Sequence, residues 1–134
     1  MSFSALDSAL LGPLFATGAM RAVFSDEARL AALLKVEAAL ARTEAEFGLA
    51  PPSLEPAIES IEPDAFDMAT LGERTAIAGV PVIPFVKALQ GKLPSELEPY
   101  LHKGATTQDI ADTGLVLQLR DALDLVAADL EAAS

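Results

Sequence analysis

Hydrophobic residues recur every three or four positions along most of the chain, a spacing that is typical of amphipathic helices. The clearest stripe begins after Ser25 or Asp26, either of which can cap a helix, and runs to Phe47. Gly48 and the prolines that follow it are stop signals. We therefore predict a long helix over residues 26–47. Its apolar stripe includes Leu30, Leu33, Leu34 and Leu40.

Prolines divide the middle of the chain into shorter elements. One short helix fits residues 54–61, and a second can start at Pro63 and run to Gly79. Residues 80–85 have a strand-like composition, but their two prolines suit the first turn of a helix that continues to Gly91. A short turn or helix is expected over residues 94–100. Every predicted element is helical, so the predicted fold class is all-α.

A second long stripe occupies the end of the chain. No Gly or Pro terminator follows it, and its apolar face needs more partner helices than a chain of 134 residues can supply. We therefore expect a truncated, N-terminal product of a longer protein. Its predicted parts are an N-terminal helical domain over residues 1–108 and a cut first helix of a central bundle over residues 109–134. The stripe consists of Leu115, Leu119, Leu123, Val126 and Leu130.

Composition narrows the possible partners. The chain has 20 acidic residues against 9 Lys and Arg, a net charge of −11, so a nucleic-acid backbone would be repelled. Cysteine is absent and there is one histidine, which makes a metal site built from this chain alone very unfavourable. The apolar stretch from Leu6 to Leu14 is short and broken by Gly12 and Pro13. We therefore expect no signal peptide, no membrane partner and a cytoplasmic protein.

The residues before the last helix have the pattern of an anion site. Thr106 and Asp109 match the capping box, in which a hydroxyl and an acid three residues later satisfy each other's backbone amides. Free amides at a helix start, with the hydroxyls of Thr106 and Thr107 and the ring of His102, could bind a carboxylate or phosphate. Gly104 lets the backbone bend closely around such a ligand. A plain helix cap and a structural histidine are the competing interpretations.

The same run, HKGATTQDIADT, resembles the first conserved region of the fumarase/aspartase superfamily, H-x-G-x-T-S-x-D-x-x-D-T. Thr107 stands where the family usually has serine. The resemblance extends along the chain, because MRAVFSDEARLAALLKVEAALARTEAEFGLAPP is similar to the opening helix of adenylosuccinate lyases and carboxymuconate cycloisomerases. The residues that match the conserved region are His102, Gly104, Thr106, Asp109, Asp112 and Thr113.

Two positions separate the branches of this superfamily. Adenylosuccinate lyases usually carry an Arg-Tyr pair and a His-Asp pair where this chain has Leu14-Phe15 and Val80-Pro81, so a nucleotide substrate is disfavoured. The segments GVPVIPFVKAL, GATTQDIADTG and LVLQLRDALDL resemble the cycloisomerase branch. Val80 and Lys103 depart from that branch, which has asparagine and an aromatic residue there.

The resemblance implies a lactonizing enzyme that converts 3-carboxy-cis,cis-muconate to 4-carboxymuconolactone in protocatechuate degradation, the β-ketoadipate pathway. It implies a homotetramer, a small tricarboxylate substrate, no cofactor, and a proton donor outside this segment, so the chain alone should be inactive. By the same resemblance, the site residues are His102, which orients or hydrogen-bonds the substrate; Thr106 and Thr107, which hold a carboxylate; Gly104 and Gln108, which help to bind it; and Asp109, Asp112 and Thr113, which give structural support.

Two other functions are compatible with the sequence. One is a different lyase of the same superfamily, such as an adenylosuccinate or argininosuccinate lyase. The other is a non-catalytic helical module that uses its acidic surface and open apolar stripe for assembly. In that case the run from His102 to Asp109 would be only a helix cap.

Overall fold

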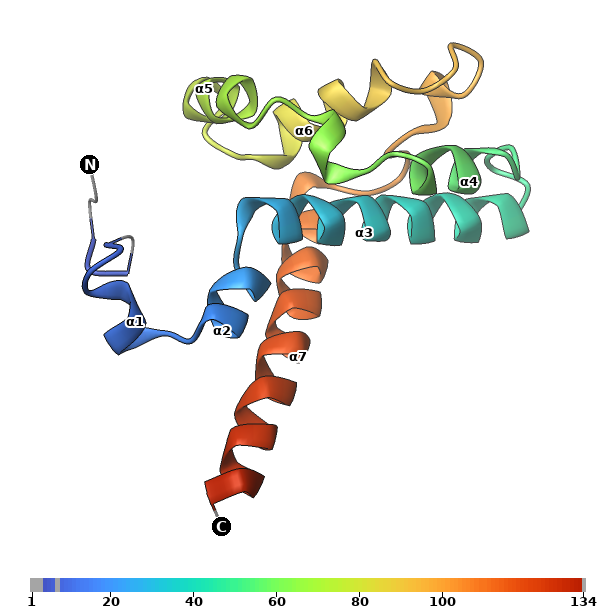
Figure 1. The fold of residues 1–134 in the computed structure, drawn as a ribbon. Coiled ribbons are helices and arrows are strands. Elements are labelled where there is room, and N and C mark those ends of the chain that lie inside the picture. The colour runs from blue at the N-terminus through green and yellow to red at the C-terminus, as the bar shows by residue number, and fades with distance from the viewer. Residues whose placement is uncertain (1–3, 7, 134) are drawn as a thin grey trace.

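A computed structural model describes residues 4–6 and 8–133, and in these ranges all regular structure is helical, as predicted (Figure 1). Residues 1–3, 7 and 134, which fall in the two predicted domains, lie outside the described residues. The elements in chain order are α1 (Gly12–Phe15), α2 (Gly18–Val23), α3 (Asp26–Glu46), α4 (Leu54–Glu59), η1 (Pro63–Ala65), α5 (Met68–Ala78), α6 (Val82–Gln90), η2 (Glu98–Tyr100) and α7 (Thr107–Ala133).

The central helix α3 confirms the first prediction. The side chain of Ser25 accepts a hydrogen bond from the amide of Ala28 at 3.1 Å, which satisfies one of the free donors at the helix start. The helix ends at Glu46, and Gly48 follows it with a φ of 70°. A left-handed residue at this place is a common way to end a helix, and glycine adopts it without a steric penalty.

The predicted helix over residues 63–79 is wrong in one respect, because the structure divides it in two. The short helix η1 ends at Ala65, and Phe66 is extended, with φ −104° and ψ 137°. Asp67 then caps α5 by accepting hydrogen bonds from the amides of Ala69 and Thr70. A side-chain acceptor of this kind competes with the helical backbone and starts a new helix. The break also buries the ring of Phe66 in the core.

The opening segment contains two short helices that the sequence did not predict. Helices α1 and α2 have four and six residues, which is too short for a hydrophobic period to be visible. Thr17 caps α2 by accepting a hydrogen bond from the amide of Met20 at 3.2 Å. None of the described helices is long and apolar enough to span a bilayer.

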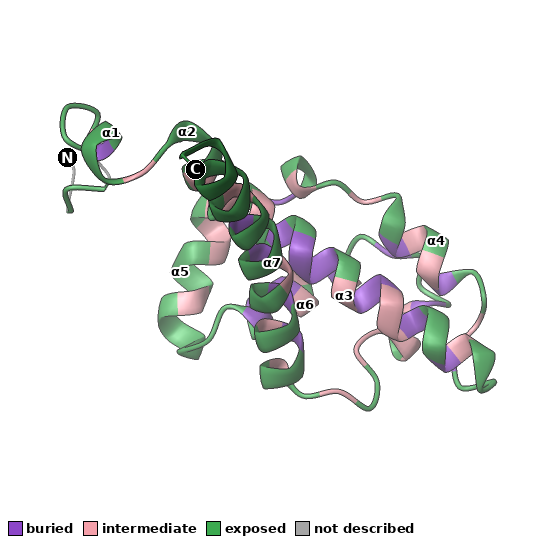
Figure 2. Ribbon diagram, turned by 90° about the horizontal axis from the view of Figure 1, so that it is seen from below, coloured by how far each residue is buried: buried purple, intermediate pink, exposed green. Residues whose placement is uncertain are grey.

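The hydrophobic core lies around α3 (Figure 2). Helices α4, α5 and α6 lie on one side of α3, and α7 leaves on the other side and projects away from the rest (Figure 1). The predicted helix after residue 80 is confirmed as α6, with Pro81 as its N-cap. The largest apolar side chains among the most deeply buried residues are Leu54, Ile58, Val82, Phe85, Leu89 and Ile110.

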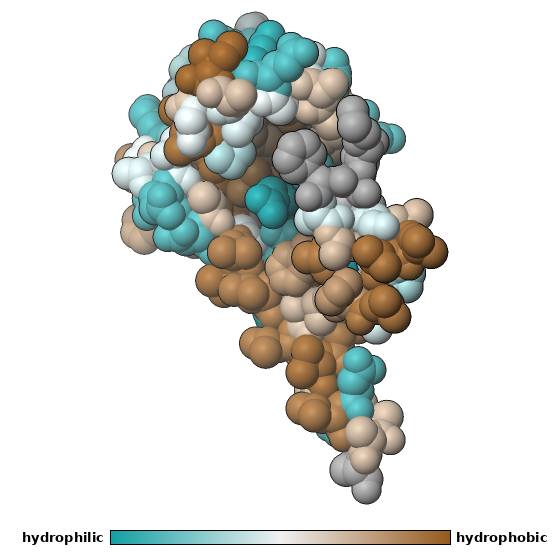
Figure 3. All heavy atoms as spheres, turned by 90° about the vertical axis from the view of Figure 1, so that its left-hand side faces the viewer, coloured by the Kyte–Doolittle hydropathy of each residue, from teal (hydrophilic) through white to brown (hydrophobic). Residues whose placement is uncertain are grey.

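Helix α7 is buried along one face between Ile110 and Ala122, and no residue after Ala122 is buried in the described part of the helix. It begins at Thr107, two residues before the predicted boundary of the bundle helix. Ile110, Gly114, Gln118 and Ala122 are its buried residues. The apolar stripe that predicted this helix is largely exposed, and Leu123 and Leu130 are 65% and 66% exposed. Figure 3 shows hydrophobic side chains along the projecting length of α7.

Candidate functional site

The predicted capping box forms at the start of α7. The backbone N–H of Thr106 donates to Oδ2 of Asp109 at 2.8 Å, and the Thr106 hydroxyl donates to the same oxygen at 3.0 Å. The amide of Asp109 in turn reaches the Thr106 hydroxyl oxygen at 3.4 Å. The bonds from Thr106 lower the pKa of Asp109 below its ordinary value. Because the hydroxyl hydrogen of Thr106 is used inside the cap, this side chain is a poor donor for a ligand.

Better donors lie at the next two positions. Among the described residues, the backbone N–H groups of Thr107 and Gln108 have no hydrogen-bond partner, and neither has the half-buried hydroxyl of Thr107. These amides belong to the first turn of a long helix, where the backbone dipoles favour a negative charge. The arrangement therefore has the donors and the field that a carboxylate needs.

His102 is held by a residue that sequence reasoning missed. Its Nδ1 lies 2.7 Å from Oε1 of Glu37, which comes from the middle of α3. The Glu37 side chain is 1% exposed and that of His102 is 17% exposed. His102 has a φ of 57°, in the left-handed region that non-glycine residues rarely adopt. The contact with Glu37 thus fixes both the ring and an uncommon backbone turn.

A second buried carboxylate adjoins this loop. Oε1 of Glu44 lies 3.8 Å from the place that a Cβ on Gly104 would occupy, and Gly104 has a φ of 74°. Burial raises the pKa of Glu44, and the positive charge of Lys103 partly opposes this. Burial also raises the pKa of Glu37, against the lowering effect of its hydrogen bond to His102. Two desolvated carboxyl groups, those of Glu37 and Glu44, therefore lie against the loop before α7.

The sequence did contain a signal for these two acids. Glu37 and Glu44 are seven residues apart and lie on the buried face of α3. Charged side chains at such positions are almost never fully buried unless they are paired. A carboxylate in the apolar stripe of a predicted helix could therefore have been noted as a candidate partner for the only histidine. The sequence alone could not have shown which of the two acids pairs with His102.

The remaining predicted site residues lie along α7. Gln108 donates from Nε2 to Oδ1 of Asp112 at 2.6 Å, so these two exposed side chains bind each other one turn apart. Thr113 is exposed and makes no side-chain hydrogen bond with any residue that the structure describes. The structure thus brings together Thr106 with Asp109 and Gln108 with Asp112. It places Glu37, rather than any predicted residue, against His102.

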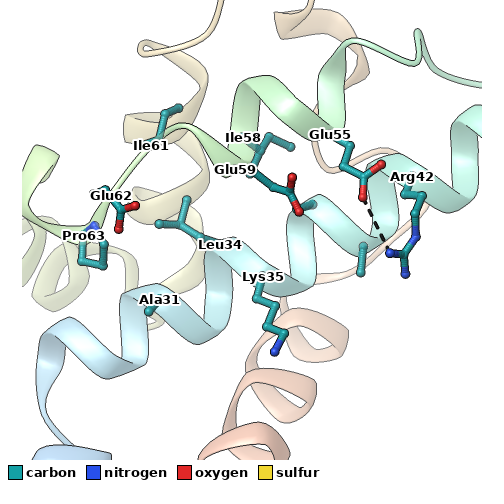
Figure 4. A pocket seen from close by; sticks show the side chains of 12 residues that line it. Ala31, Leu34, Lys35, Arg42, Glu55, Ile58, Glu59, Ile61, Glu62 and Pro63 are labelled. Carbon is teal, nitrogen blue, oxygen red and sulfur yellow. Dashed lines mark ion pairs between the residues drawn. The ribbon is translucent and has the colours of Figure 1, made fainter.

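A groove with a volume of about 480 Å³ lies elsewhere, between α3 and α4 (Figure 4). It is lined by Lys35, Arg42 and Glu55 among others, and contains none of the predicted site residues. Arg42 and Glu55 form an ion pair at 3.7 Å across it, both partly exposed. Among residues 4–6 and 8–133, no three acidic or histidine side chains are placed to hold a metal ion. The predicted site residues and the free helix-start amides lie at the loop before α7 and the start of that helix, and not in this groove.

Comparison with known proteins gives several relatives, although no protein-family model matches the chain. The chain is 52% identical over 120 residues to a 3-carboxy-cis,cis-muconate cycloisomerase of Pseudomonas putida, a match that covers 87% of this chain and 28% of that protein. It is 42% identical over 132 residues to an N-acetyl-S-(2-succino)cysteine lyase of Enterococcus italicus, covering 98% of this chain and 29% of the relative. The chain thus spans less than a third of the length of these relatives.

Solved structures agree with these matches. The crystal structure of the Pseudomonas putida 3-carboxy-cis,cis-muconate lactonizing enzyme superposes with a TM-score of 0.88 at 50% identity, over 92% of this chain and 29% of that one. A fumarate lyase from Mesorhizobium superposes with a TM-score of 0.76 at 37% identity, over 84% of this chain and 26% of the other. From these sequence and structural matches, the chain belongs to the fumarase/aspartase superfamily.

Proposed function

We propose that this chain supplies the first active-site region of a 3-carboxy-cis,cis-muconate cycloisomerase, and that it binds one carboxylate of the tricarboxylate substrate. The observation that carries the proposal is the pair of free donors at the start of α7, the amides of Thr107 and Gln108, in a segment whose preceding loop carries His102. The identity to cycloisomerases over most of the chain supports it. In this proposal Asp109 and Asp112 brace the site, since bare carboxylates would repel the substrate, and Thr106 is held in the helix cap by its bonds to Asp109.

The reaction explains why such donors are useful. A carboxylate oxygen of the substrate adds to one carbon of a conjugated double bond, and the new C–O bond closes the lactone. The displaced electron pair moves to the neighbouring carbon and its attached carboxylate, and an acid delivers a proton to that carbon. Negative charge therefore grows on that carboxylate in the transition state, where fixed donors stabilise it most. The substrate is isomerised without oxidation or reduction, so the chemistry calls for no redox cofactor.

Other parts of the proposed enzyme come from outside these residues. By its resemblance to the superfamily, we expect a homotetramer in which several subunits contribute to each site, and a proton donor beyond this chain. The exposed stripe of α7, including Leu123 and Leu130, is suited to a helical bundle of this kind. In this proposal the protein acts in the cytoplasm, in protocatechuate degradation.

A second candidate is a lyase that eliminates a group from a substituted succinate. It is favoured by the 42% identity to the N-acetyl-S-(2-succino)cysteine lyase, which extends over 98% of this chain. A nitrosuccinate lyase of Streptomyces davaonensis is 39% identical over 94% of the chain. A carboxylate site at the start of α7 would serve either reaction.

Chimeric enzymes can separate them. The matching segment of the Pseudomonas putida cycloisomerase is replaced by this chain, and the same exchange is made in the Enterococcus italicus lyase. The proposal predicts lactone formation from 3-carboxy-cis,cis-muconate by the first chimera, and little elimination by the second. Activity only in the lyase chimera would favour the second candidate. The chain alone is expected to be inactive, and lactone formation by it at the rate of a complete enzyme would overturn that expectation.

Substitution of the histidine tests the site itself. In the active chimera, His102→Ala should raise the KM and lower kcat, by about 1.5–3 kcal/mol if a charge-assisted bond is lost. Arg42→Ala, in the groove between α3 and α4, is the matched control and should leave both constants near their starting values. Unchanged kinetics in His102→Ala would show that the histidine is structural.

Binding can be followed in the isolated chain as well. Titration with tricarballylate, a stable tricarboxylate, should move the amide NMR signals of residues 104–108 more than those of the groove. Signals that stay in place throughout would favour the helical assembly module, in which the loop is only a cap.

A further inference from the structure

The contact between Glu37 and His102 has a feature that a simple ion pair does not explain. Oε1 of Glu37 lies 2.7 Å from Nδ1, while Oε2 is buried and has no partner among the described residues. The Nε2 atom of His102 also has no hydrogen-bond partner there. One ring nitrogen is therefore held by a buried acid, and the other is left for a ligand.

Counting protons on the pair decides what Nε2 can do. If Glu37 is ionised and His102 is a cation, the ring carries hydrogens on both nitrogens. If the shared proton sits on Oε1 instead, Nδ1 becomes the acceptor and the neutral ring keeps its hydrogen on Nε2. In both forms the pair has no net charge and Nε2 donates. Nε2 becomes an acceptor only when the pair carries a net negative charge.

The surroundings oppose that negative form. The carboxyl of Glu37 is almost completely buried, and a desolvated charge without a partner is costly. From α3, Glu44 adds a second carboxyl group close enough to disfavour a charge on Glu37. Asp109 at the start of α7 is a further acidic group, and it interacts electrostatically with His102. Lys103 is the positive group beside Glu44. These surroundings therefore disfavour the form in which the pair carries a net negative charge.

From this geometry we propose that Glu37 is a positioning residue which holds Nε2 of His102 as a hydrogen-bond donor toward an anionic ligand at the start of α7. The inference rests on the carboxylate-binding function proposed above. It explains why a buried acid is kept in the core of α3, 65 residues away from the histidine. It also explains how His102 keeps its left-handed backbone, since the bond to Glu37 fixes the ring.

Because His102 is the only histidine of the chain, its ring can be observed without assignment. The chain is labelled with ¹⁵N, and long-range ¹H–¹⁵N spectra are recorded near neutral pH. The expected result is an Nε2 signal at the position of a protonated nitrogen. An Nε2 signal at the position of an unprotonated nitrogen would overturn the proposal, whatever the chain binds.

Glu37→Gln keeps the size of the side chain and removes its charge and its proton. A glutamine can either accept from Nδ1 or donate to it, so the protonated share of Nε2 should fall. Glu46→Gln makes the same chemical change at an exposed position of α3 and should leave the ring signals unchanged. Circular dichroism confirms that each variant is folded. Ring signals that are alike in both variants and in the unsubstituted chain would contradict the positioning role.

Affinity for tricarballylate separates this inference from the proposed function. If both hold, Glu37→Gln weakens binding about tenfold through the loss of a charge-assisted donor, while Glu46→Gln does not. A chain that has a protonated Nε2 but does not bind the tricarboxylate would count against the proposed function and leave the positioning role supported.

Discussion

Ile110 is the residue that anchors α7, and with it the candidate site, to the helical core. It is 2% exposed and packs in the core cluster formed by α3, α4 and α6. Substitution by alanine removes three carbon atoms, worth about 2.4 kcal/mol at about 0.8 kcal/mol each. The cavity left behind adds to this, so we expect Ile110→Ala to lower the free energy of unfolding by about 3 kcal/mol.

The assay is urea unfolding followed by far-UV circular dichroism. Leu123→Ala is the control, because this leucine lies on the same helix but is 65% exposed, and it should cost less than about 0.5 kcal/mol. If the alanine variant of Ile110 is unfolded from the start, Ile110→Val gives a smaller loss of about 0.5–1.5 kcal/mol. Each variant is measured at low and high protein concentration, so that association through the exposed stripe is recognised.

Two results would refute this reasoning. One is a loss below about 1 kcal/mol for Ile110→Ala, which would mean that α7 is not held by its first turns. The other is an equal loss for Leu123→Ala at low concentration, which would mean that the projecting part of α7 is folded against the chain. Because the loop with His102 leads directly into α7, the first variant should also broaden the amide signals of residues 102–108.

Three further predictions concern the loop and the helix cap. Thr106→Ala should lower the free energy of unfolding by about 1 kcal/mol, measured in urea, and no loss would show that the cap is dispensable. The pKa of Asp109 is lowered by its bonds to Thr106, so its contribution to stability is present above the ordinary pKa of aspartate and lost as the pH falls through the lowered value. An acid titration of Asp109→Asn beside the unsubstituted chain should show less loss of stability in that range, and identical curves would contradict it. Gly104→Ala should cost about 1 kcal/mol because of its positive φ, while Gly72→Ala, inside α5 with open space around it, should gain up to about 1 kcal/mol in thermal unfolding; the same sign for both would contradict this.

Features that depend on neighbours in the chain were predicted well. The start of α3 at Ser25 and the Thr106–Asp109 box follow from side chains that reach backbone amides a few residues away, and such contacts are visible in the sequence. Family membership likewise follows from a local run of residues around His102. The break before α5 was missed although it is local, because Asp67 in a helical stretch can cap a helix or simply face solvent.

What the sequence alone determined about this protein is therefore its two long helices, its all-α class and the run of residues that resembles the superfamily's first conserved region. The tertiary structure decided which of those residues have hydrogen-bonding groups that are not already used within the chain. It showed that the Thr106 hydroxyl is occupied by the cap, and that His102 is paired with Glu37 from a helix far away in the chain. The physical reason is that helix periods and caps are set by spacings of three or four residues. The meeting of a buried acid with a distant imidazole depends on how α3 and the loop before α7 pack, and no local pattern encodes that.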